Sequence, residues 1–312
     1  MTAQTIDGRA VAQKIKDRVR SEIKELSGVI PPIKVASILV GDNAAAALYI
    51  RNQERTAGQV GILFENVQLS AETSEAELVA EVKRLNADET ITGIIVQRPL
   101  PEGINTRRIQ AKIHPDKDIE GLNPANMGFI VVGEPKLVPC TALASIKLLL
   151  STGVDPHGLD VVVIGHSEIV GKPIAFMLLN MFATVTVCHV ATADLREHTL
   201  QADVIFIAVG KPGLLRGHML KPGCIVIDIG INQVLQLDEE GREILDEKGR
   251  PRTRVIGDVD FESAREVAGA ITPVPGGVGP VTVATLLLNA VMAARFQHRD
   301  LVAPPDPTVT AF

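Results

Sequence analysis

Short runs of apolar, β-forming residues alternate with stretches of helical periodicity along most of the chain. A pattern of this kind folds into βαβ units, in which a helix connects two parallel strands. The predicted strands span residues 33–40, 62–69, 91–97, 161–165, 184–189, 204–209 and 225–230. The predicted helices lie between Asp7 and Gly28 and over residues 43–60, 74–85, 142–150 and 280–296. The sequence therefore predicts an α/β fold with parallel sheets.

Aliphatic side chains have to fill the core of this fold. The hydrophobic fraction of 46% is ample, but aromatic residues make up only 3% of the chain, with no Trp and one Tyr. Strands rich in Val, Ile and Leu are typical of parallel sheets that helices cover on both faces. The length of 312 residues favours two domains. Polar turns are expected at residues 238–241 and 246–252, and a loose tail at residues 301–312.

The net charge limits the partners that the protein can bind, and the cysteines indicate its redox state and metal content. The net charge of −6 argues against a nucleic acid or an anionic membrane, because both bind a basic surface. Cys140, Cys188 and Cys224 are far apart and outside any metal-binding spacing, so we expect reduced thiols in the core and no metal site. The N-terminus has no signal-peptide pattern, and no uninterrupted apolar run approaches the roughly 18 residues of a membrane helix. A cytoplasmic location is expected.

A strand, a tight turn and a helix start follow one another at residues 161–173. Gly165 allows the backbone to turn and a phosphate to approach, and Gly171 allows close packing of helix on strand. The free N–H groups of that helix would bind a pyrophosphate. Ser167 stands where a G-x-G-x-x-G pattern has its second Gly, so an ordinary βα turn is the alternative. Gly210, at the end of a later strand, favours the dinucleotide site.

Six segments form an ordered series of motifs along the chain. They are Val40-Gly41-Asp42-Asn43, Val96-Gln97-Arg98-Pro99-Leu100-Pro101, Asp116-Lys117-Asp118-Ile119-Glu120-Gly121, Ile169-Val170-Gly171-Lys172-Pro173, Gly257-Asp258-Val259-Asp260-Phe261 and Ile271-Thr272-Pro273-Val274-Pro275-Gly276-Gly277-Val278-Gly279-Pro280. With these motifs the chain resembles the FolD family, the methylenetetrahydrofolate dehydrogenase/cyclohydrolases, over residues 5–298. The last segment is highly specific.

The resemblance implies a two-domain α/β architecture and a particular chemistry. Residues 1–140 with 280–300 would form a folate-binding catalytic domain, and residues 141–279 a Rossmann-type NAD(P)-binding domain with a doubly wound parallel sheet. The folate would lie in the cleft between the domains, and the protein would be a homodimer. The implied reaction is hydride transfer from 5,10-methylenetetrahydrofolate to NAD(P), which gives 5,10-methenyltetrahydrofolate.

The resemblance also assigns roles to individual residues. The catalytic positions are Tyr49, Gln53, Gln97 and Glu120. The substrate-binding positions are Val96, Arg98, Pro273, Pro275, Gly276 and Gly277. The cofactor-binding positions are Gly165, His166, Ser167, Val190, Gly210 and Ile231.

One position departs from the family in a way that bears on the reaction. The family's pocket helix resembles Tyr-Val-x-x-Lys-x-Lys, and after Tyr49 the two lysines are replaced by Gln53 and Arg55. Hydride removal from the methylene carbon needs positioning and electrostatics, but no proton taken by the protein. Hydrolysis of the methenyl product needs protons to be moved, which the untitratable Gln53 cannot do. We therefore expect a largely monofunctional dehydrogenase; the alternative is that water and Tyr49 still support hydrolysis.

Further departures leave other classes of function open. Ala46 stands where the family often has Ser, Arg98 where it has Leu, and Glu120 where it has Asp. Since Glu is one methylene longer than Asp, a shifted pterin or a different C1 carrier is one alternative. A non-catalytic folate-binding paralogue is another, because the lysine is missing. A purely structural Rossmann-type protein has only the generic fold in its favour.

The residues expected around the adenosine ribose do not agree on whether the cofactor is NAD or NADP. NADP-dependent members of the family often have Arg after the first Gly of the turn and Ser after the next strand, and here His166 and Val190 occupy these positions. The weaker phosphate contacts favour NAD. However, His189 ends the second strand, where an NAD site usually has an Asp or Glu for the ribose. The sequence predicts a nicotinamide cofactor without deciding between NAD and NADP.

Overall fold

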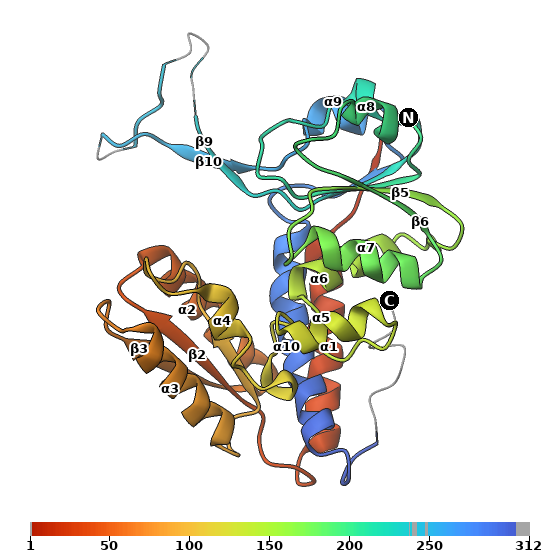
Figure 1. Ribbon diagram of the computed structural model, residues 1–312. Helices are drawn as coiled ribbons and strands as arrows, with labels where there is room; N and C mark the ends of the chain where they lie inside the picture. The colour runs from red at the N-terminus through yellow and green to blue at the C-terminus, as the bar shows by residue number, and fades with distance from the viewer. Residues whose placement is uncertain (1, 237, 239–241, 247–248, 304–312) are drawn as a thin grey trace. The chain divides into compact units, whose positions relative to one another are not determined.

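The computed structural model describes residues 2–236, 238, 242–246 and 249–303. The chain forms two compact units, each assembled from two separate stretches of sequence (Figure 1). Unit 1 is drawn from Met1–Val11 and Ala144–Val281, and unit 2 from Ala12–Leu143 and Thr282–Phe312.

Unit 2 contains a parallel sheet with the strand order β3-β2-β4. The strands are β2 (Lys34–Val40), β3 (Leu63–Leu69) and β4 (Gly93–Val96). The central strand β2 pairs on both sides, with Ile38 opposite Val67 of β3 and Val96 of β4. Residues 35–40 of β2 are all buried, as expected for a strand whose sheet is covered on both faces.

Two helices cover opposite faces of β2 and therefore pack against alternate residues of this strand. The helix α3 (Glu75–Ala87) packs on the face that carries Ile38. The helix α2 (Ala44–Val60) packs on the face that carries Leu39. Because successive side chains of a strand point to opposite faces, Ser37 also lies on the α2 face. This places one buried hydroxyl beside the helix that the sequence identified as the pocket helix.

The remaining helices are mostly short. They are α1 (Gly8–Leu26), α4 (Thr106–Gln110), α5 (Pro124–Val131), α6 (Cys140–Leu150), α7 (Gly171–Asn180), α8 (Leu195–Thr199), α9 (Phe261–Arg265) and α10 (Val278–Gln297), with 3-10 helices at Pro115–Lys117 and Gly217–Met219.

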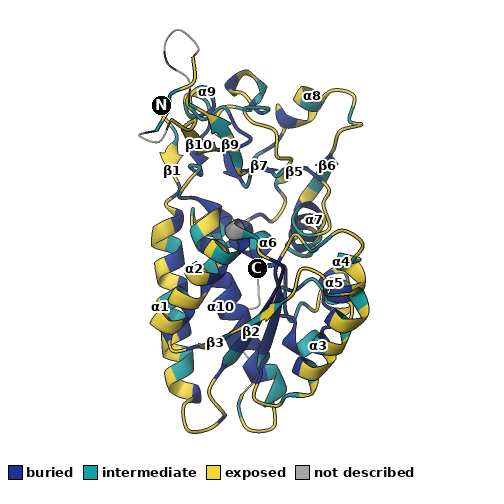
Figure 2. Cartoon of the chain, turned by 90° about the vertical axis from the view of Figure 1, so that its left-hand side faces the viewer, coloured by how far each residue is buried: buried dark blue, intermediate teal, exposed yellow. Residues whose placement is uncertain are grey.

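The long helix α10 is packed as a core helix. Its length and composition alone would allow it to cross a membrane, but 83% of its most apolar window is buried inside the protein. Figure 2 shows α10 largely in the dark blue of buried residues. Near its end, Arg295 Nη2 donates to Glu22 Oε2 of α1 at 2.6 Å. This ion pair joins two helices from opposite ends of the sequence.

Unit 1 contains a parallel sheet with the strand order β1-β11-β8-β7-β5-β6. The strands are β1 (Gln4–Thr5), β5 (Asp160–Ile164), β6 (Thr184–Cys188), β7 (Val204–Ile207), β8 (Ile225–Asp228) and β11 (Ala270–Ile271). From β5 the chain goes to β6 on one side and then to β7 and β8 on the other. The strand order therefore reverses at β5, which confirms the expected doubly wound, Rossmann-type sheet.

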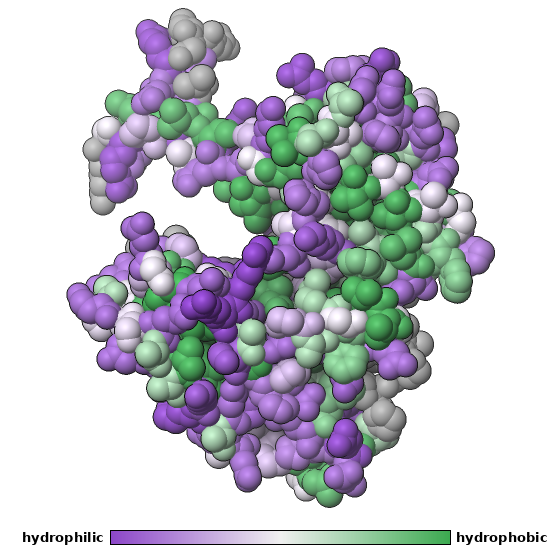
Figure 3. All heavy atoms as spheres, in the orientation of Figure 1, coloured by the Kyte–Doolittle hydropathy of each residue, from purple (hydrophilic) through white to green (hydrophobic). Residues whose placement is uncertain are grey.

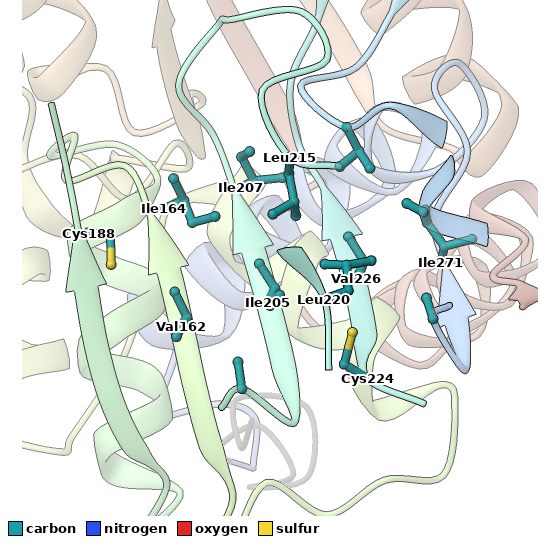
Figure 4. Close-up of a cluster of buried hydrophobic side chains, with 14 residues drawn as sticks. Val162, Ile164, Cys188, Ile205, Ile207, Leu215, Leu220, Cys224, Val226 and Ile271 are labelled. Atoms are coloured by element: carbon teal, nitrogen blue, oxygen red, sulfur yellow. The ribbon is translucent and has the colours of Figure 1, made fainter. Parts of the chain in front are cut away.

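Aliphatic side chains from alternate strand positions form the core on one face of this sheet. Figure 4 shows Val162 and Ile164 of β5 beside Ile205 and Ile207 of β7. Val226 of β8 continues the row. All three cysteines of the chain are buried and free, as expected.

The predicted helices and strands appear within two residues of their predicted bounds. One strand, predicted over residues 91–97, is shorter: β4 begins only at Gly93, because the Ile91 N–H donates to the Asp88 carbonyl in the turn after α3. The sequence pattern did not predict the two-residue strands β1 and β11, which pair with each other in parallel.

An antiparallel hairpin of β9 (Asn232–Leu235) and β10 (Thr253–Ile256) was also not predicted. The polar turns expected at 238–241 and 246–252 fall between these strands. Residues 239–241 and 247–248 lie outside the described residues, as do residues 304–312 of the expected tail.

Candidate functional site

A chain of buried amide and hydroxyl groups crosses the α2 face of the sheet in unit 2. Gln97, which follows β4, is only 6% exposed, and its Nε2 donates to Ser37 Oγ and to Gln53 Oε1, each at 2.9 Å. The Gln97 N–H also donates to the Ile38 carbonyl, which continues the β4–β2 ladder. Gln53 is 2% exposed. The fold thus fixes both amides, and the orientation of Gln53 leaves its Nε2 free to donate elsewhere.

Tyr49 lies one helical turn before Gln53 on α2. The Gln53 amide is close enough to the Tyr49 hydroxyl to lower its pKa. Although the residue is 41% exposed as a whole, burial of its hydroxyl, together with the neighbouring Cys140 and Glu120, raises the pKa of Tyr49 to about 12. Tyr49 therefore keeps its proton at neutral pH. A protonated hydroxyl at this place can donate to a bound molecule.

Glu120 and Arg98, two of the positions that depart from the family, contact each other. Arg98 Nη2 lies 3.5 Å from Glu120 Oε1. Burial raises the pKa of Glu120 to about 7; Arg98 opposes this shift and Asp118 adds to it. The other oxygen, Oε2, is buried and has no hydrogen-bond partner among the described residues. A buried carboxylate oxygen without a hydrogen bond destabilises the folded protein unless a ligand donates to it.

Four buried residues that the sequence analysis gave no role hold the turn that carries Glu120. Asp118, which is fully buried, accepts from Asn123 N at 2.6 Å and from Asn126 Nδ2 at 2.9 Å. Asn289 of α10 donates through Nδ2 to the Ile119 carbonyl at 2.8 Å. Asp118 belongs to one of the quoted motifs, which was the available signal for its importance.

Val96 is placed differently from the other predicted residues of unit 2. Its side chain is buried in the cluster that α3 forms with one face of the sheet. The buried Ser37 and Gln53 lie on the α2 face. The side chain of Val96 therefore belongs to the core. Val96 contributes to the site only as the last residue of β4, after which Gln97 follows.

The predicted dinucleotide turn lies between β5 and α7 in unit 1. Gly165 has φ +115°, a conformation that favours glycine. A Cβ at Gly171 would collide with the Gly165 carbonyl oxygen, so the helix packs against the turn as closely as the backbone permits. Ser167 Oγ accepts from the Val170 N–H at 3.2 Å. The turn is therefore preorganised by its two glycines and the serine, and it fits a bound dinucleotide phosphate.

Two histidines meet at the end of β6. The rings of His166 and His189 have centroids 5.1 Å apart. Val190, the next residue, is fully exposed. Neither Arg nor Asp or Glu ends this strand, so the structure adds no charged group that would decide between NADP and NAD.

Asp258 holds the two other predicted cofactor loops. Its Oδ2 accepts from Val209 N at 2.7 Å and Gly210 N at 3.0 Å, and its Oδ1 accepts from Asn232 Nδ2 at 2.8 Å. Ile231, beside Asn232, is 71% exposed. Asp258 is fully buried, and the sequence analysis gave it no role although it stands in a quoted motif.

The Gly/Pro-rich segment forms a turn between β11 and α10. The Gly277 N–H donates to the Pro273 carbonyl at 2.8 Å, and the Val274–Pro275 peptide bond is cis. Pro273, Pro275, Gly276 and Gly277 are thus close together in unit 1, whereas Tyr49, Gln53, Gln97, Arg98 and Glu120 are close together in unit 2.

A doubly wound sheet with a glycine turn after its first strand defines the class of NAD(P)-binding Rossmann-type proteins. The sequence matches the tetrahydrofolate dehydrogenase/cyclohydrolase catalytic domain over residues 6–120 and the NAD(P)-binding domain of the same family over residues 139–298. The chain therefore belongs to the tetrahydrofolate dehydrogenase/cyclohydrolase family. The resemblance and the NAD(P) cofactor class expected from the sequence are confirmed.

Individual relatives agree with this assignment over nearly the full chain. "Bifunctional protein FolD 2" of Mesorhizobium japonicum is 48% identical over 94% of this chain and 92% of its own length. The crystal structure of the FolD dehydrogenase/cyclohydrolase from Campylobacter jejuni is 40% identical and has a TM-score of 0.85, covering 95% of this chain and 99% of its own. The Trypanosoma brucei enzyme, complexed with NADP and an inhibitor, is 38% identical with a TM-score of 0.86, covering 96% and 99%.

Proposed function

We propose that this protein oxidises 5,10-methylenetetrahydrofolate to 5,10-methenyltetrahydrofolate with NAD(P) and has weak or no cyclohydrolase activity. The observation that carries the proposal is the buried amide of Gln53, which accepts from Gln97 and lies one helical turn after Tyr49 on α2. An untitratable group occupies the centre of the polar cluster.

Oxidation requires the pocket to orient the folate and to tolerate positive charge. The bound nicotinamide supplies the acceptor for the hydride. The Glu120 carboxylate stabilises the cationic product when it is ionised, and its unpartnered Oε2 accepts from the amino group of the pterin. The Tyr49 hydroxyl and the Gln97 amide fix the ring between them. None of these roles moves a proton, so the loss of the lysine leaves them intact.

Hydrolysis requires a group that takes and returns protons. Gln53 cannot do so, and its Oε1 already accepts from Gln97. Lys117, which stands in the same motif as Glu120, is no substitute, because its Nζ donates to the carbonyls of Leu85 and Asp88. Tyr49, with a pKa raised to about 12, is a poor base at neutral pH.

A bifunctional enzyme is the second candidate function. Glu120 has a pKa of about 7 and an oxygen without a partner, so it is the one group of this cluster that can exchange a proton near neutral pH. Relatives named as bifunctional also favour this candidate.

A time-resolved absorption experiment separates the two candidates. Purified protein is mixed with 5,10-methylenetetrahydrofolate and either NAD or NADP, and reduced cofactor and methenyl product are followed together. Equal accumulation of both species supports the dehydrogenase without an effective hydrolase. Methenyl product that decays faster than in a protein-free control favours the bifunctional enzyme. If neither cofactor is reduced, the result favours the interpretation that the protein is a non-catalytic folate-binding paralogue or acts on a different C1 carrier.

We propose further that the protein is a cytoplasmic homodimer, as the family resemblance implies. Sedimentation equilibrium tests the oligomeric state, and a mass equal to that of a single chain would contradict it.

A further inference from the structure

Two acidic side chains are buried next to each other where β8 ends in unit 1. Asp228, the last residue of β8, is 3% exposed, and Asp258 is fully buried. Figure 3 shows hydrophilic side chains on the surface over the region where α8 and α9 lie in Figure 1, whereas these two acids lie inside the unit. None of the Lys, Arg or His side chains that the structure describes forms an ion pair with either carboxyl group. The pair is therefore held by hydrogen-bond donors rather than by a cation.

These donors come from three loops of the unit. Asp228 Oδ1 accepts from the N–H groups of Gly230 and Asp258, at 2.9 and 3.0 Å. Its Oδ2 accepts from the Val259 N–H at 3.0 Å. Asp258 in turn accepts from the loop after β7 and from the side chain at the start of β9. Each of the four carboxylate oxygens thus accepts at least one hydrogen bond, and the loops after β7, β8 and β10 are joined through two side chains.

Two glycines leave the space that the carboxyl groups occupy. A Cβ at Gly257 would collide with Asp228 Oδ2, and a Cβ at Gly230 would collide with Asp258 Oδ1. Any other residue at either position would displace a carboxylate, because only glycine has no Cβ. The backbone of these loops is therefore shaped around the two acids.

The end of β8 is also connected to the Gly/Pro-rich segment. The Asp228 N–H donates to Thr272 Oγ1 at 2.7 Å, and Thr272 is fully buried. This bond involves the backbone of Asp228 and not its carboxylate. A change at Thr272 therefore disturbs the same place without removing a titratable group.

The ionised form of Asp228 is unfavourable in this environment but fits its donors. Burial raises the pKa of Asp228 to about 6; the backbone N–H groups oppose this shift and Asp258 adds to it. A carboxylate only accepts hydrogen bonds, whereas a protonated carboxyl group has a hydrogen on one oxygen, which then faces an N–H group instead of accepting from it. Among the described residues the titratable group that faces Asp228 is Asp258, from the loop after β10, while β11 contributes the Thr272 hydroxyl. Protonation of Asp228 therefore breaks part of the connection between the loops after β8 and β10.

We infer that Asp228 and Asp258, as a pair of buried carboxylates, are positioning residues for the nicotinamide cofactor. The inference rests on the proposed function, in which Gly210 and Ile231 bind NAD(P). The Gly210 N–H donates to Asp258, and Ile231 follows the Gly230 whose N–H donates to Asp228. Because both carboxylates are buried, they act on the cofactor through these loops. Binding of NAD(P) weakens as Asp228 gains a proton.

The test measures the affinities for NAD and NADP by calorimetry, without folate. We expect the wild type to bind about threefold more weakly at about pH 5.5 than at about pH 7.5, because the pKa of Asp228 is about 6. Asp228→Asn imitates the protonated form, so its dissociation constant should be about tenfold higher at the upper pH. The pH dependence that this variant retains comes from other groups, such as the 2′-phosphate of NADP and His166, and is the baseline for the comparison.

Two controls separate this role from a general loss of stability. Thr272→Val should keep the pH dependence of the wild type, because both carboxylates remain. Glu197→Gln removes an exposed acid of α8 and should match the wild type at both pH values. Equal pH dependence in the wild type and Asp228→Asn, or its loss in Thr272→Val, overturns the inference.

Hydrogen exchange of the wild type decides the question if Asp228→Asn does not fold. After correction for the intrinsic exchange rate, the N–H groups of Gly230, Asp258 and Val259 should lose protection between about pH 7.5 and about pH 5.5, while those of β5 keep theirs. Unchanged protection overturns the inference. Neither experiment contains folate, so a pH-dependent affinity supports the inference even if the proposed reaction is not observed, and a pH-independent affinity overturns it even if the dehydrogenase is active.

Discussion

If the proposed function is right, Gln53 determines which of the two folate reactions the protein performs well. Replacing it by Lys restores a titratable group between Tyr49 and Gln97, so Gln53→Lys should raise the rate of methenyl hydrolysis by about a hundredfold. Dehydrogenase activity should change far less, because hydride removal needs no base. The measurement is the decay of added methenyltetrahydrofolate with each variant. Gln53→Met, which keeps the length without the amide, is the control and should not gain hydrolysis.

We expect His166 to contact the adenosine end of the cofactor. Replacing it by Arg adds a permanent guanidinium charge, which forms two parallel hydrogen bonds to a phosphate. His166→Arg should therefore lower the KM for NADP by about tenfold and leave the KM for NAD almost unchanged. Steady-state kinetics with both cofactors measures this ratio. An equal effect on NAD and NADP would show that position 166 does not contact the 2′-phosphate.

Glu120 should make the stability of the protein depend on pH. Its pKa is raised from 4.5 to about 7 in the folded state, so the folded protein holds this proton more tightly than the unfolded chain. Stability is therefore lost as the pH rises through this interval, by up to about 3 kcal/mol. Glu120→Gln should remove this part of the pH dependence.

Urea unfolding at several values between pH 4.5 and 7 measures the effect of Glu120. The exposed Glu134→Gln variant is the matched control, and its stability profile should follow that of the wild type. Parallel profiles for Glu120→Gln and wild type would mean that Glu120 titrates like an ordinary surface carboxyl.

At the scale of single elements, α10 supports the site from a distance. Asn289 Nδ2 donates to the carbonyls of Ile119 and Val138, at 2.8 and 2.9 Å. Asn289→Leu keeps the volume but leaves two buried carbonyls without this donor, which should cost about 2–5 kcal/mol. Because Ile119 precedes Glu120, the KM for the folate should rise as well. Thermal unfolding and substrate titration of this variant check both effects, and an unchanged KM would separate the helix from the site.

The regular elements could be predicted from the sequence because their periodicity is local. The strand predicted over residues 204–209 and the helix predicted over residues 43–60 follow from the spacing of their apolar residues. The strands β1 and β11 were not predicted, because two residues are too few to show a periodic pattern. Their pairing also joins Gln4 to Ala270, which are far apart in the sequence. Such contacts depend on the whole fold and leave no trace in a short window of sequence.

The candidate site was predictable in its residue types but not in its contacts. A family motif showed Gln53 to be unusual, and the same comparison marked Arg98 and Glu120 as separate departures. That Arg98 and Glu120 form one ion pair follows from the place where β4 ends and from the turn that Asp118 holds. The role of Asp258 also depends on tertiary contacts, since it binds backbone N–H groups about fifty residues away.

At the scale of the whole molecule, the two units are interleaved along the chain. Unit 1 takes its first strand from residues before Val11 and the rest from Ala144–Val281. The larger part of unit 2, Ala12–Leu143, precedes the larger part of unit 1, but unit 2 lacks α10 until the end of the chain. The unit whose larger segment comes first in the sequence is therefore the last that can be completed.

During synthesis on the ribosome, this arrangement reverses the usual N-to-C order of domain folding. Unit 1 has all its strands once Val281 has left the exit tunnel, whereas unit 2 still waits for Asn289 and Arg295. Nascent chains stalled at that point should protect residues 144–281 from protease while residues 12–143 are still cleaved. The half of the protein that we expect to hold the folate is thus the last to mature.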